Sequence, residues 1–300
     1  MDSLESALAD FVGYPRALLF STGYMANLGV ITALAGREDA LFADKLNHAS
    51  LNDAMLLSRA RFHRYPHLDL DALARALQAS TARRKLIVTD AVFSMDGDIA
   101  PIPRLLELCE AHDAYVLVDD AHGFGVLGEH GEGTLGHFGT QSERVIYMAT
   151  LGKAAGVYGA FVAGPPVLID YLVNRARTYI YTTATPPALA ATLLASLAIV
   201  RDEGWRRERL SELIGALNVG LGEHAARLLP SRTAIQPLVL GDAARTLAVS
   251  QALKALGFIV PAVRPPTVPR GTARLRISLS AAHTVEDVQA LAAALRGVIA

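Results

Sequence analysis

The sequence has few lysines, because arginine supplies most of its positive charge. The four lysines are Lys45, Lys85, Lys153 and Lys254. An arginine guanidinium stays protonated and cannot form an imine, whereas a lysine amine can lose its proton and attack a carbonyl. Lys153 lies in a glycine-rich stretch directly after the apolar run 145–149. By itself this stretch also suits an ordinary surface lysine, so the role of Lys153 depends on the rest of the chain.

Other scarcities exclude whole classes of protein. The single cysteine, Cys109, excludes an intramolecular disulfide, and its helix-like surroundings favour a small core side chain over a nucleophile. No apolar run approaches the roughly 18–20 residues that span a bilayer. The first residues lack the basic region of a signal peptide, so we expect a cytoplasmic protein. A formal charge of -1 gives no electrostatic reason to expect binding to nucleic acid or to an anionic membrane.

Short β-rich runs alternate with helical patterns, which predicts an α/β fold with a mostly parallel sheet. With 52% hydrophobic residues, the 300-residue chain can bury a core large enough for two lobes. The composition changes near Asp202, so we expect a large domain at 1–201 and a smaller α+β domain at 202–300. In the large domain we expect strands at 17–20, 40–43, 86–89, 115–119, 145–149 and 159–163, and helices at 4–11, 24–34, 70–79, 103–111 and 187–201. In the small domain we expect strands at 234–240, 258–263 and 273–279, and helices opening near 206 and covering 246–256 and 285–299.

Four of the expected strands end in residues that suit a binding site. In an open α/β sheet, ligands bind beyond the carboxyl ends of the strands. One strand runs through Gly23 into a helix, whose free N–H groups and dipole suit a phosphate. His48 follows a second strand, Asp119 ends a strongly apolar third, and Lys153 follows a fourth. Each residue alone also suits an ordinary role in a turn, loop or cap, and it is their shared edge of the sheet that favours a site.

Three motifs that resemble other sites lack the required context. Residues 123–128 match the Gly-x-Gly-x-x-Gly dinucleotide pattern, but loop residues follow them instead of a helix. The Gly-Lys pair before Ala154 is no P-loop, because alanine stands where that loop needs serine or threonine. His63 and His67 have the helical spacing of metal ligands, but Pro66 between them argues against a helix. We therefore expect no metal site.

Pyridoxal phosphate is a cofactor whose binding requires the types of residue found at these strand ends. It requires an imine-forming lysine, a carboxylate that keeps its ring nitrogen protonated, a group that stacks on the ring and a phosphate cradle. Lys153, Asp119, His48 and Gly23 supply one of each. The pairing of an aspartate with the ring nitrogen makes the ring an electron sink, which stabilises a carbanion on the substrate.

Longer motifs around these residues resemble a known family. Over essentially its whole length the chain resembles the α-oxoamine synthases, which are fold-type I pyridoxal-phosphate enzymes. Members of that family carry a further N-terminal segment, with an Asn-Asp-Tyr-Leu-Gly stretch and a Gly/Ser-rich stretch, and this chain begins roughly where that segment ends. The matching stretches are 46–50, 92–98, 118–123, 150–153, 264–269 and 274–276, of which 92–98, 118–123 and 150–153 are highly specific.

The resemblance implies a role for each residue of the site. Lys153 would bind the cofactor covalently, Asp119 would pair with its ring nitrogen, and His48 would stack on the ring. Arg276 would clamp the carboxylate of the amino acid, which suits a bidentate guanidinium, although a strand arginine in a surface ion pair is the alternative. His122 and Ser94 would bond the phenolic oxygen of the cofactor or its neighbourhood, and Gly23, Tyr24 and Thr150 would hold its phosphate. Thr182 and Thr183 would reach the phosphate of the other subunit of a homodimer. Thr267 would contact the substrate.

The implied reaction is an acyl transfer with loss of carbon dioxide, in which Lys153, His48, Asp119 and His122 would be the catalytic residues. The stretch 264–269 favours the biotin-synthesis branch, in which L-alanine condenses with a pimeloyl group carried by coenzyme A or by an acyl carrier protein. Glycine C-acetyltransferase, 5-aminolevulinate synthase and serine palmitoyltransferase chemistry stay open at this point, as does an inactive fragment or binding protein. An ordinary aminotransferase is not favoured, because the matched motifs belong to the acyltransferase branch.

Overall fold

The chain divides into two compact units in the computed structural model, which describes residues 1–299. One unit contains Met1–Phe93 and Ile99–Glu203, and the other contains Ser94–Asp98 and the chain from Gly204 onward. The division expected from the sequence, 1–201 and 202–300, differs from this chiefly in Ser94–Asp98. Polar contacts hold that segment in the second unit, and hydrophobic patterning does not reveal such contacts.

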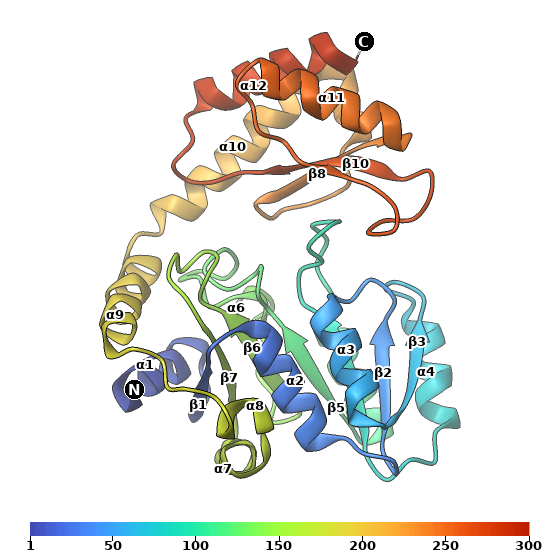
Figure 1. Cartoon of the computed structure of the whole chain (residues 1–300), viewed down its shortest axis with the longest axis vertical. Helices are drawn as coiled ribbons and strands as arrows, with labels where there is room; N and C mark the ends of the chain where they lie inside the picture. The colour runs from blue at the N-terminus through green and yellow to red at the C-terminus, as the bar shows by residue number, and fades with distance from the viewer. Residues whose placement is uncertain (300) are drawn as a thin grey trace. The chain divides into compact units, whose positions relative to one another are not determined.

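A seven-stranded sheet forms the middle of the first unit, in the order β1-β7-β6-β5-β4-β2-β3 (Figure 1). The neighbours from β3 to β6 run parallel, whereas β7 is antiparallel to both β6 and β1. β1 therefore points in the same direction as β6. The expected mostly parallel sheet is confirmed. Its strands are β1 (Arg16–Phe20), β2 (Ala40–Asp44), β3 (Arg61–Tyr65), β4 (Lys85–Asp90), β5 (Ala114–Asp119), β6 (Val145–Thr150) and β7 (Ala160–Gly164).

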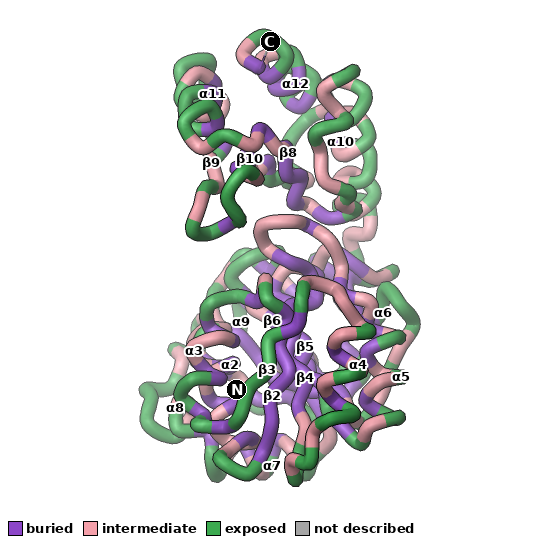
Figure 2. Tube along the Cα trace, turned by 90° about the vertical axis from the view of Figure 1, so that its right-hand side faces the viewer, coloured by how far each residue is buried: buried purple, intermediate pink, exposed green. Residues whose placement is uncertain are grey.

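Helices cover both faces of this sheet, because successive side chains of a strand point to opposite faces and both sets are apolar. Ile87 and Val116 belong to one apolar cluster, and their chain neighbours Val88 and Leu117 belong to another. Figure 2 shows the central strands of this unit as buried. The first cluster includes residues of α1 (Asp2–Val12), α4 (Leu70–Ala79), α5 (Ile102–His112), α6 (Thr134–Phe138) and α9 (Pro187–Asp202). The second includes residues of α2 (Gly23–Leu34), α3 (Ala49–Ser58), α7 (Pro166–Arg175) and α8 (Arg177–Ile180).

Several elements were not expected from the sequence. β3 is an edge strand with four exposed residues out of five, so it lacks the apolar alternation that predicts a strand. The buried face of α3 mixes Ser50 and Ser58 with Leu51, Ala54 and Met55, and the exposed Leu56 and Leu57 obscure its apolar stripe. Helices α6, α7 and α8 were also not expected, and α6 and α8 are short, with five and four residues.

The second unit has a three-stranded antiparallel sheet in the order β8-β10-β9. Leu275 and Ile277 pack into the apolar cluster formed with its helices, so Arg274 and Arg276, which alternate with them, lie on the opposite face. The strand expected at 258–263 shrinks to two residues, because Pro261 has no N–H to extend the ladder. The elements are α10 (Trp205–Leu221), the 3-10 helix η1 (Gly222–Arg227), β8 (Ile235–Gly241), α11 (Ala243–Ala255), β9 (Ala262–Val263), β10 (Ala273–Ser278) and α12 (Val285–Ile299). Across residues 1–299, no helix combines the length and the apolar character needed to cross a membrane.

Candidate functional site

The carboxyl ends of the parallel strands meet at one edge of the large sheet. The last residues of β4, β5 and β6 are Asp90, Asp119 and Thr150, and Asp90 is in register with Asp119. β1 ends at the same edge, because Phe20 and Thr150 both pair with Ala160. The strand ends that the sequence singled out therefore lie at the same edge of the sheet in the first unit.

Helix α2 begins at this edge, directly after β1. Its N-cap residue, Thr22, accepts the N–H of Met25 at Oγ1, at 3.2 Å, and the carbonyl of Thr22 accepts the next N–H of the helix. Within residues 1–299 this leaves the N–H groups of Gly23 and Tyr24 for a ligand at the positive end of the helix dipole. A Cβ on Gly23 would lie 2.5 Å from Cγ2 of Thr150, so the close approach of α2 to β6 requires glycine here.

Asp119 is a buried carboxylate, 4% exposed, that accepts hydrogen bonds from two donors. Nδ2 of Asn27 donates to Oδ2 at 2.7 Å, and the N–H of Ala121 donates to Oδ1 at 3.1 Å. Burial raises the pKa of Asp119, whereas the Asn27 hydrogen bond and the charge of Lys153 lower it. An ionised carboxylate in this position needs a cationic partner, because two donors alone do not offset the loss of its hydration.

A chain of hydrogen bonds joins Asp119 to His48, which stands at another strand end. Nδ2 of Asn27 donates to Asp119 and also to Oγ of Ser50, at 2.9 Å. The N–H of Ser50 donates to Nδ1 of His48 at 3.2 Å, and its hydroxyl lies 2.8 Å from the same nitrogen. A backbone N–H can only donate, so Nδ1 accepts, and a neutral His48 ring carries its proton on Nε2. Asn27 and Ser50 thus hold the Asp119 carboxylate and the His48 ring in a fixed relation.

Asp90 is a second buried acid beside Asp119, also 4% exposed. Its Oδ2 accepts the N–H of His48 at 2.6 Å. Burial, and then the charge of Asp119, raises the pKa of Asp90 well above its ordinary value, and the charge of Lys153 opposes this. Two adjacent buried carboxylates resist ionising together. Asp119 accepts hydrogen bonds from two donors and the Asp90 side chain from one, so the ionised form is favoured at Asp119 over Asp90.

Asp120 has a structural role. It is fully buried, and it accepts from the N–H of Thr134 at 2.6 Å, from the hydroxyl of Thr134 at 2.5 Å and from the Tyr147 hydroxyl at 2.9 Å. Burial raises the pKa of Asp120 to about 7, against the lowering effect of these bonds. The bonds fasten the turn after β5, which carries the half-buried His122, to α6 and β6.

Lys153 is exposed in the loop between β6 and β7. The N–H of Leu151 donates to the carbonyl of Gly159 at 2.8 Å, and the N–H of Gly156 donates to the carbonyl of Lys153 at 2.9 Å, which closes the loop into a tight turn. The charge of Lys153 lowers the pKa of both buried acids, Asp119 and Asp90. Its ammonium group therefore interacts electrostatically with the same strand ends that carry those acids.

The other residues expected in the site belong to the second unit or to exposed loops. Ser94 and Arg276 both belong to the second unit, where Nε of Arg276 donates to the carbonyl of Ser94 at 2.6 Å. In the part of the chain that the structure describes, Arg276 forms no ion pair, which goes against the surface-pair alternative. Thr267 is exposed in the turn after β9. Thr182 and Thr183 are exposed between α8 and α9, and within residues 1–299 neither forms a hydrogen bond with another expected site residue.

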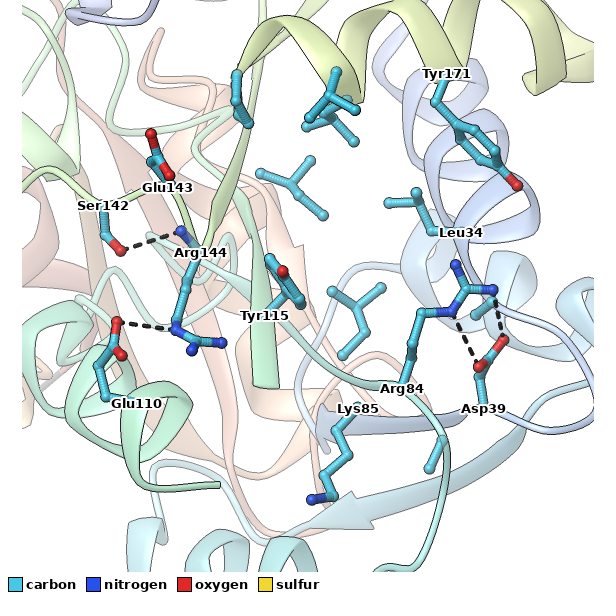
Figure 3. A pocket seen from close by; sticks show the side chains of 17 residues that line it. Leu34, Asp39, Arg84, Lys85, Glu110, Tyr115, Ser142, Glu143, Arg144 and Tyr171 are labelled. Carbon is cyan, nitrogen blue, oxygen red and sulfur yellow. Dashed lines mark hydrogen bonds and ion pairs between the residues drawn. The ribbon is translucent and has the colours of Figure 1, made fainter. Parts of the chain in front are cut away.

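A cavity of about 880 Å³ lies at the opposite edge of the large sheet, at the amino ends of the parallel strands (Figure 3). Four of its charged groups form ion pairs: Arg84 pairs with Asp39 at 3.2 Å, and Arg144 pairs with Glu110 at 2.9 Å. Nζ of Lys85 donates to a backbone carbonyl at 2.8 Å. This cavity contains none of the residues expected in the site, and its paired charges give it no evident chemistry.

Three residues of the hydrogen-bond chain were missed in the sequence. Asn27 is a polar residue inside an otherwise apolar helix, which is a sign of a buried hydrogen-bonding role. Asp90 ends its strand as Asp119 does, and this repetition could have revealed it. Ser50 ends the matching stretch 46–50, but a serine two residues after His48 otherwise reads as an ordinary residue of a helix N-terminus, so no role was assigned to it.

Comparison with known proteins identifies relatives along the whole chain. Residues 1–295 match the family described as aminotransferase class I and II. An 8-amino-7-oxononanoate synthase from Nitrosospira multiformis is 63% identical over 295 residues, which are 98% of this chain and 74% of that protein. A solved serine palmitoyltransferase variant from S. paucimobilis, with bound PLP and myriocin, has a TM-score of 0.93 and 34% identity, covering 98% of this chain and 75% of that one. The solved 8-amino-7-oxononanoate synthase from Francisella tularensis has a TM-score of 0.86 and 32% identity, covering 98% and 85%.

Proposed function

The chain belongs to the 8-amino-7-oxononanoate synthases within the class I and II aminotransferase family, and we propose that it condenses L-alanine with a pimeloyl thioester to give 8-amino-7-oxononanoate. It is a pyridoxal-phosphate-dependent acyltransferase of biotin synthesis. The observation that carries the choice of substrates is the 63% identity to a synthase of that name over nearly the whole chain.

The first unit fits the cofactor. Asp119 is a buried acid that needs a cation, and Oδ1 of Asn27, in the same cluster, is buried with no hydrogen-bond partner within residues 1–299. The N–H groups of Gly23 and Tyr24 lie at a helix N-terminus on the same sheet edge, which suits a phosphate. When bound there, pyridoxal phosphate supplies an electron sink that stabilises negative charge at the α-carbon of the amino acid.

Each residue at this edge of the sheet would have its own role in binding the cofactor or in catalysis. Asp119, hydrogen-bonded to Asn27, would hold the proton on the ring nitrogen, and the His48 ring would pack against the ring face. Thr150 would add its hydroxyl to the phosphate site formed by the start of α2. Nζ of Lys153 would bind the cofactor and, when released, would take the α-proton of the amino acid and later return one. His122 would lie beside the phenolic oxygen.

The substrate residues belong to the second unit. The guanidinium of Arg276 would bind the carboxylate of the amino acid, and Ser94, whose carbonyl it holds, would contribute its hydroxyl to the cofactor. Thr267, exposed in its turn, would contact the acyl substrate. Arg276 and Thr267 would contact substrate without taking part in the bond changes.

A homodimer is part of the proposal. Thr182 and Thr183 are exposed, and no hydrogen bond within residues 1–299 occupies their hydroxyls. In a dimer they would reach the phosphate bound by the partner chain. Mixing a Lys153→Ala chain with a Thr182→Ala/Thr183→Ala chain tests this, because a mixed dimer would contain one intact site and regain part of the activity. Mixtures with no more activity than the separate variants would contradict it.

The substrate assignment is tested by measuring thiol release. The purified chain, loaded with pyridoxal phosphate, is supplied with L-alanine, glycine or L-serine, each against pimeloyl, acetyl, succinyl and palmitoyl thioesters of coenzyme A. The pimeloyl group is also offered on an acyl carrier protein. We expect L-alanine with a pimeloyl thioester to exceed every other pair, and product mass to confirm the amino ketone. Preferred release with L-serine and palmitoyl-coenzyme A, or with glycine, would contradict the assignment.

A further inference from the structure

An ion pair between the buried Arg274 and the partly buried Asp96 fixes the segment Ser94–Asp98 to strand β10 in the second unit. Nη1 of Arg274 donates to Oδ1 of Asp96 at 2.6 Å and to the carbonyl of Met95 at 3.3 Å. Arg274 is 4% exposed, and its remaining nitrogens donate to Thr272, Nε to the carbonyl at 3.0 Å and Nη2 to Oγ1 at 3.1 Å. All nitrogens of this guanidinium are therefore engaged inside the protein, so Arg274 is unsuited to binding a substrate.

Arg276, two residues along the same strand, differs from Arg274. It is half-buried, and it uses one N–H on the carbonyl of Ser94, at 2.6 Å, and one on Oγ of Ser278, at 2.8 Å. A guanidinium has five N–H groups, so the rest, including the whole Nη2 amino group, have no acceptor within residues 1–299. Burial lowers the pKa of Arg276, as expected for a cation that lacks a carboxylate in the protein.

The segment Ser94–Asp98 is fastened at its other end as well. The carbonyl of Gly97 accepts from the hydroxyl of Ser231 at 2.9 Å and from that of Thr233 at 3.4 Å. Gly97 has a φ of 73°, and a Cβ there would lie 2.6 Å from the carbonyl oxygen of Ile235. The backbone around Asp96 is thus held tightly from both sides, and it can serve as a fixed support.

We propose that the Asp96–Arg274 pair is a positioning device for substrate binding: it holds the carbonyl of Ser94 where it orients Arg276 toward the carboxylate of the amino acid. This inference rests on the proposed function, because it takes Arg276 as the carboxylate clamp. Arg274 neutralises Asp96 and keeps it from competing for Arg276, and it aligns the Ser94 carbonyl with Nε. The outer edge of the Arg276 guanidinium then faces the substrate in a single orientation, which bidentate recognition of a carboxylate requires.

The test compares the affinity for L-alanine with that for L-alaninamide, which lacks the carboxylate. Both dissociation constants are measured on the cofactor-loaded protein from the change in visible absorbance, without any thioester. We expect Asp96→Ala to reduce the preference for the carboxylate about tenfold, the scale of one hydrogen bond to a charged group. Affinity for L-alaninamide and for the cofactor should stay within about twofold. In steady state, KM for L-alanine should rise while kcat changes little. Glu212→Ala, which removes the acid of the exposed Arg209–Glu212 pair in the same unit, should have no effect.

Asp96→Asn provides a second variant if Asp96→Ala does not fold, because it keeps an acceptor for Arg274 and loses only the charge. It should shift the carboxylate preference in the same direction, about threefold. An unchanged preference in a folded variant would overturn the inference, and so would equal losses for acid, amide and cofactor. The proposed function is tested separately: if the wild type prefers the carboxylate and Asp96→Ala loses that preference, but no pimeloyl thioester is consumed, the substrate assignment fails and the positioning role stands.

Discussion

Nδ2 of Asn27 lies 2.7 Å from Oδ2 of Asp119, and both residues are buried. Asn27 belongs to helix α2, whose first turn offers the phosphate site, whereas Asp119 ends a central strand. One hydrogen bond therefore ties the helix that would hold the phosphate to the acid that would hold the ring nitrogen. Pyridoxal phosphate has a fixed distance between its phosphate and its ring nitrogen, so the protein groups that bind these two ends must also be held at a fixed distance.

Asn27→Ala should weaken cofactor binding. It removes a donor from a buried carboxylate and so raises the pKa of Asp119 further, against the ionised form that the cofactor needs. A hydrogen bond to a charged group contributes about 1.5–3 kcal/mol, so the dissociation constant for pyridoxal phosphate should rise about 10- to 100-fold. Absorbance titration measures it. Thr32→Ala, on the same helix with its hydroxyl bonded to the Leu28 carbonyl, is the control that should leave it unchanged.

The two buried acids should respond differently to the same substitution. Asp119→Asn removes the charge that pairs with the ring nitrogen, and activity should fall about 100-fold or more, as for a buried ion pair that loses one member at ~3–5 kcal/mol. Asp90→Asn should reduce activity only a few-fold, because burial raises the pKa of Asp90 and so favours its neutral form, and asparagine can still accept the N–H of His48. Measured kcat/KM values decide it, and comparable losses in both variants would refute the division of roles.

The sequence predicted which residues lie at the carboxyl edge of the sheet, but it did not predict the hydrogen bonds that hold them in place. His48, Asp119 and Lys153 stand out because they follow apolar runs, and the register of the strands brings their strand ends together. Asn27 and Ser50 lie inside helices, and their partners come from elements far away in the sequence. Local patterns carry no information on such pairings, so the hydrogen-bond chain appears only in three dimensions.

The second unit shows the same limit. Alternation along β10 correctly put Arg274 and Arg276 on one face, but it did not distinguish them. Their difference comes from Ser94–Asp98, which leaves the first unit after β4 and packs in the second. β3 escaped prediction for a related reason, since an exposed edge strand buries too little to show an apolar pattern.

Gly23→Ala should lower cofactor affinity by steric displacement of the first turn of α2. The new Cβ would lie 2.5 Å from Cγ2 of Thr150, and overpacking of this kind costs about 1–3 kcal/mol, or up to about 100-fold in affinity. Thr150→Ser removes that methyl group and keeps the hydroxyl. The double variant Gly23→Ala/Thr150→Ser should therefore bind the cofactor more tightly than Gly23→Ala alone. Cofactor titrations of the wild type, the two single variants and the double variant test this. If the effects of the two substitutions on affinity simply added, the steric explanation would be contradicted.

Asp120 should give the apoprotein a characteristic pH dependence. Its pKa in the folded protein is about 7, above the ~3.9 of an unfolded chain, so the folded state binds the extra proton between these values. This contribution to stability is fully present below about pH 4 and is lost as the pH rises through 7. Asp120→Asn removes one titrating group and should flatten the decline by at most about 1.4 kcal/mol per pH unit. Unfolding of both proteins in denaturant across pH 4–8 measures this, and parallel curves would contradict it.

The proposed activity depends most on Lys153, the residue expected to bind the cofactor. Reduction of the cofactor-loaded protein with borohydride, followed by peptide mapping, tests this directly, with Lys45, Lys85 and Lys254 as internal controls. We predict that the pyridoxyl group is found on Lys153 alone and that Lys153→Arg yields no labelled peptide. A label on another lysine, or no label on a protein that holds its cofactor, would contradict the account.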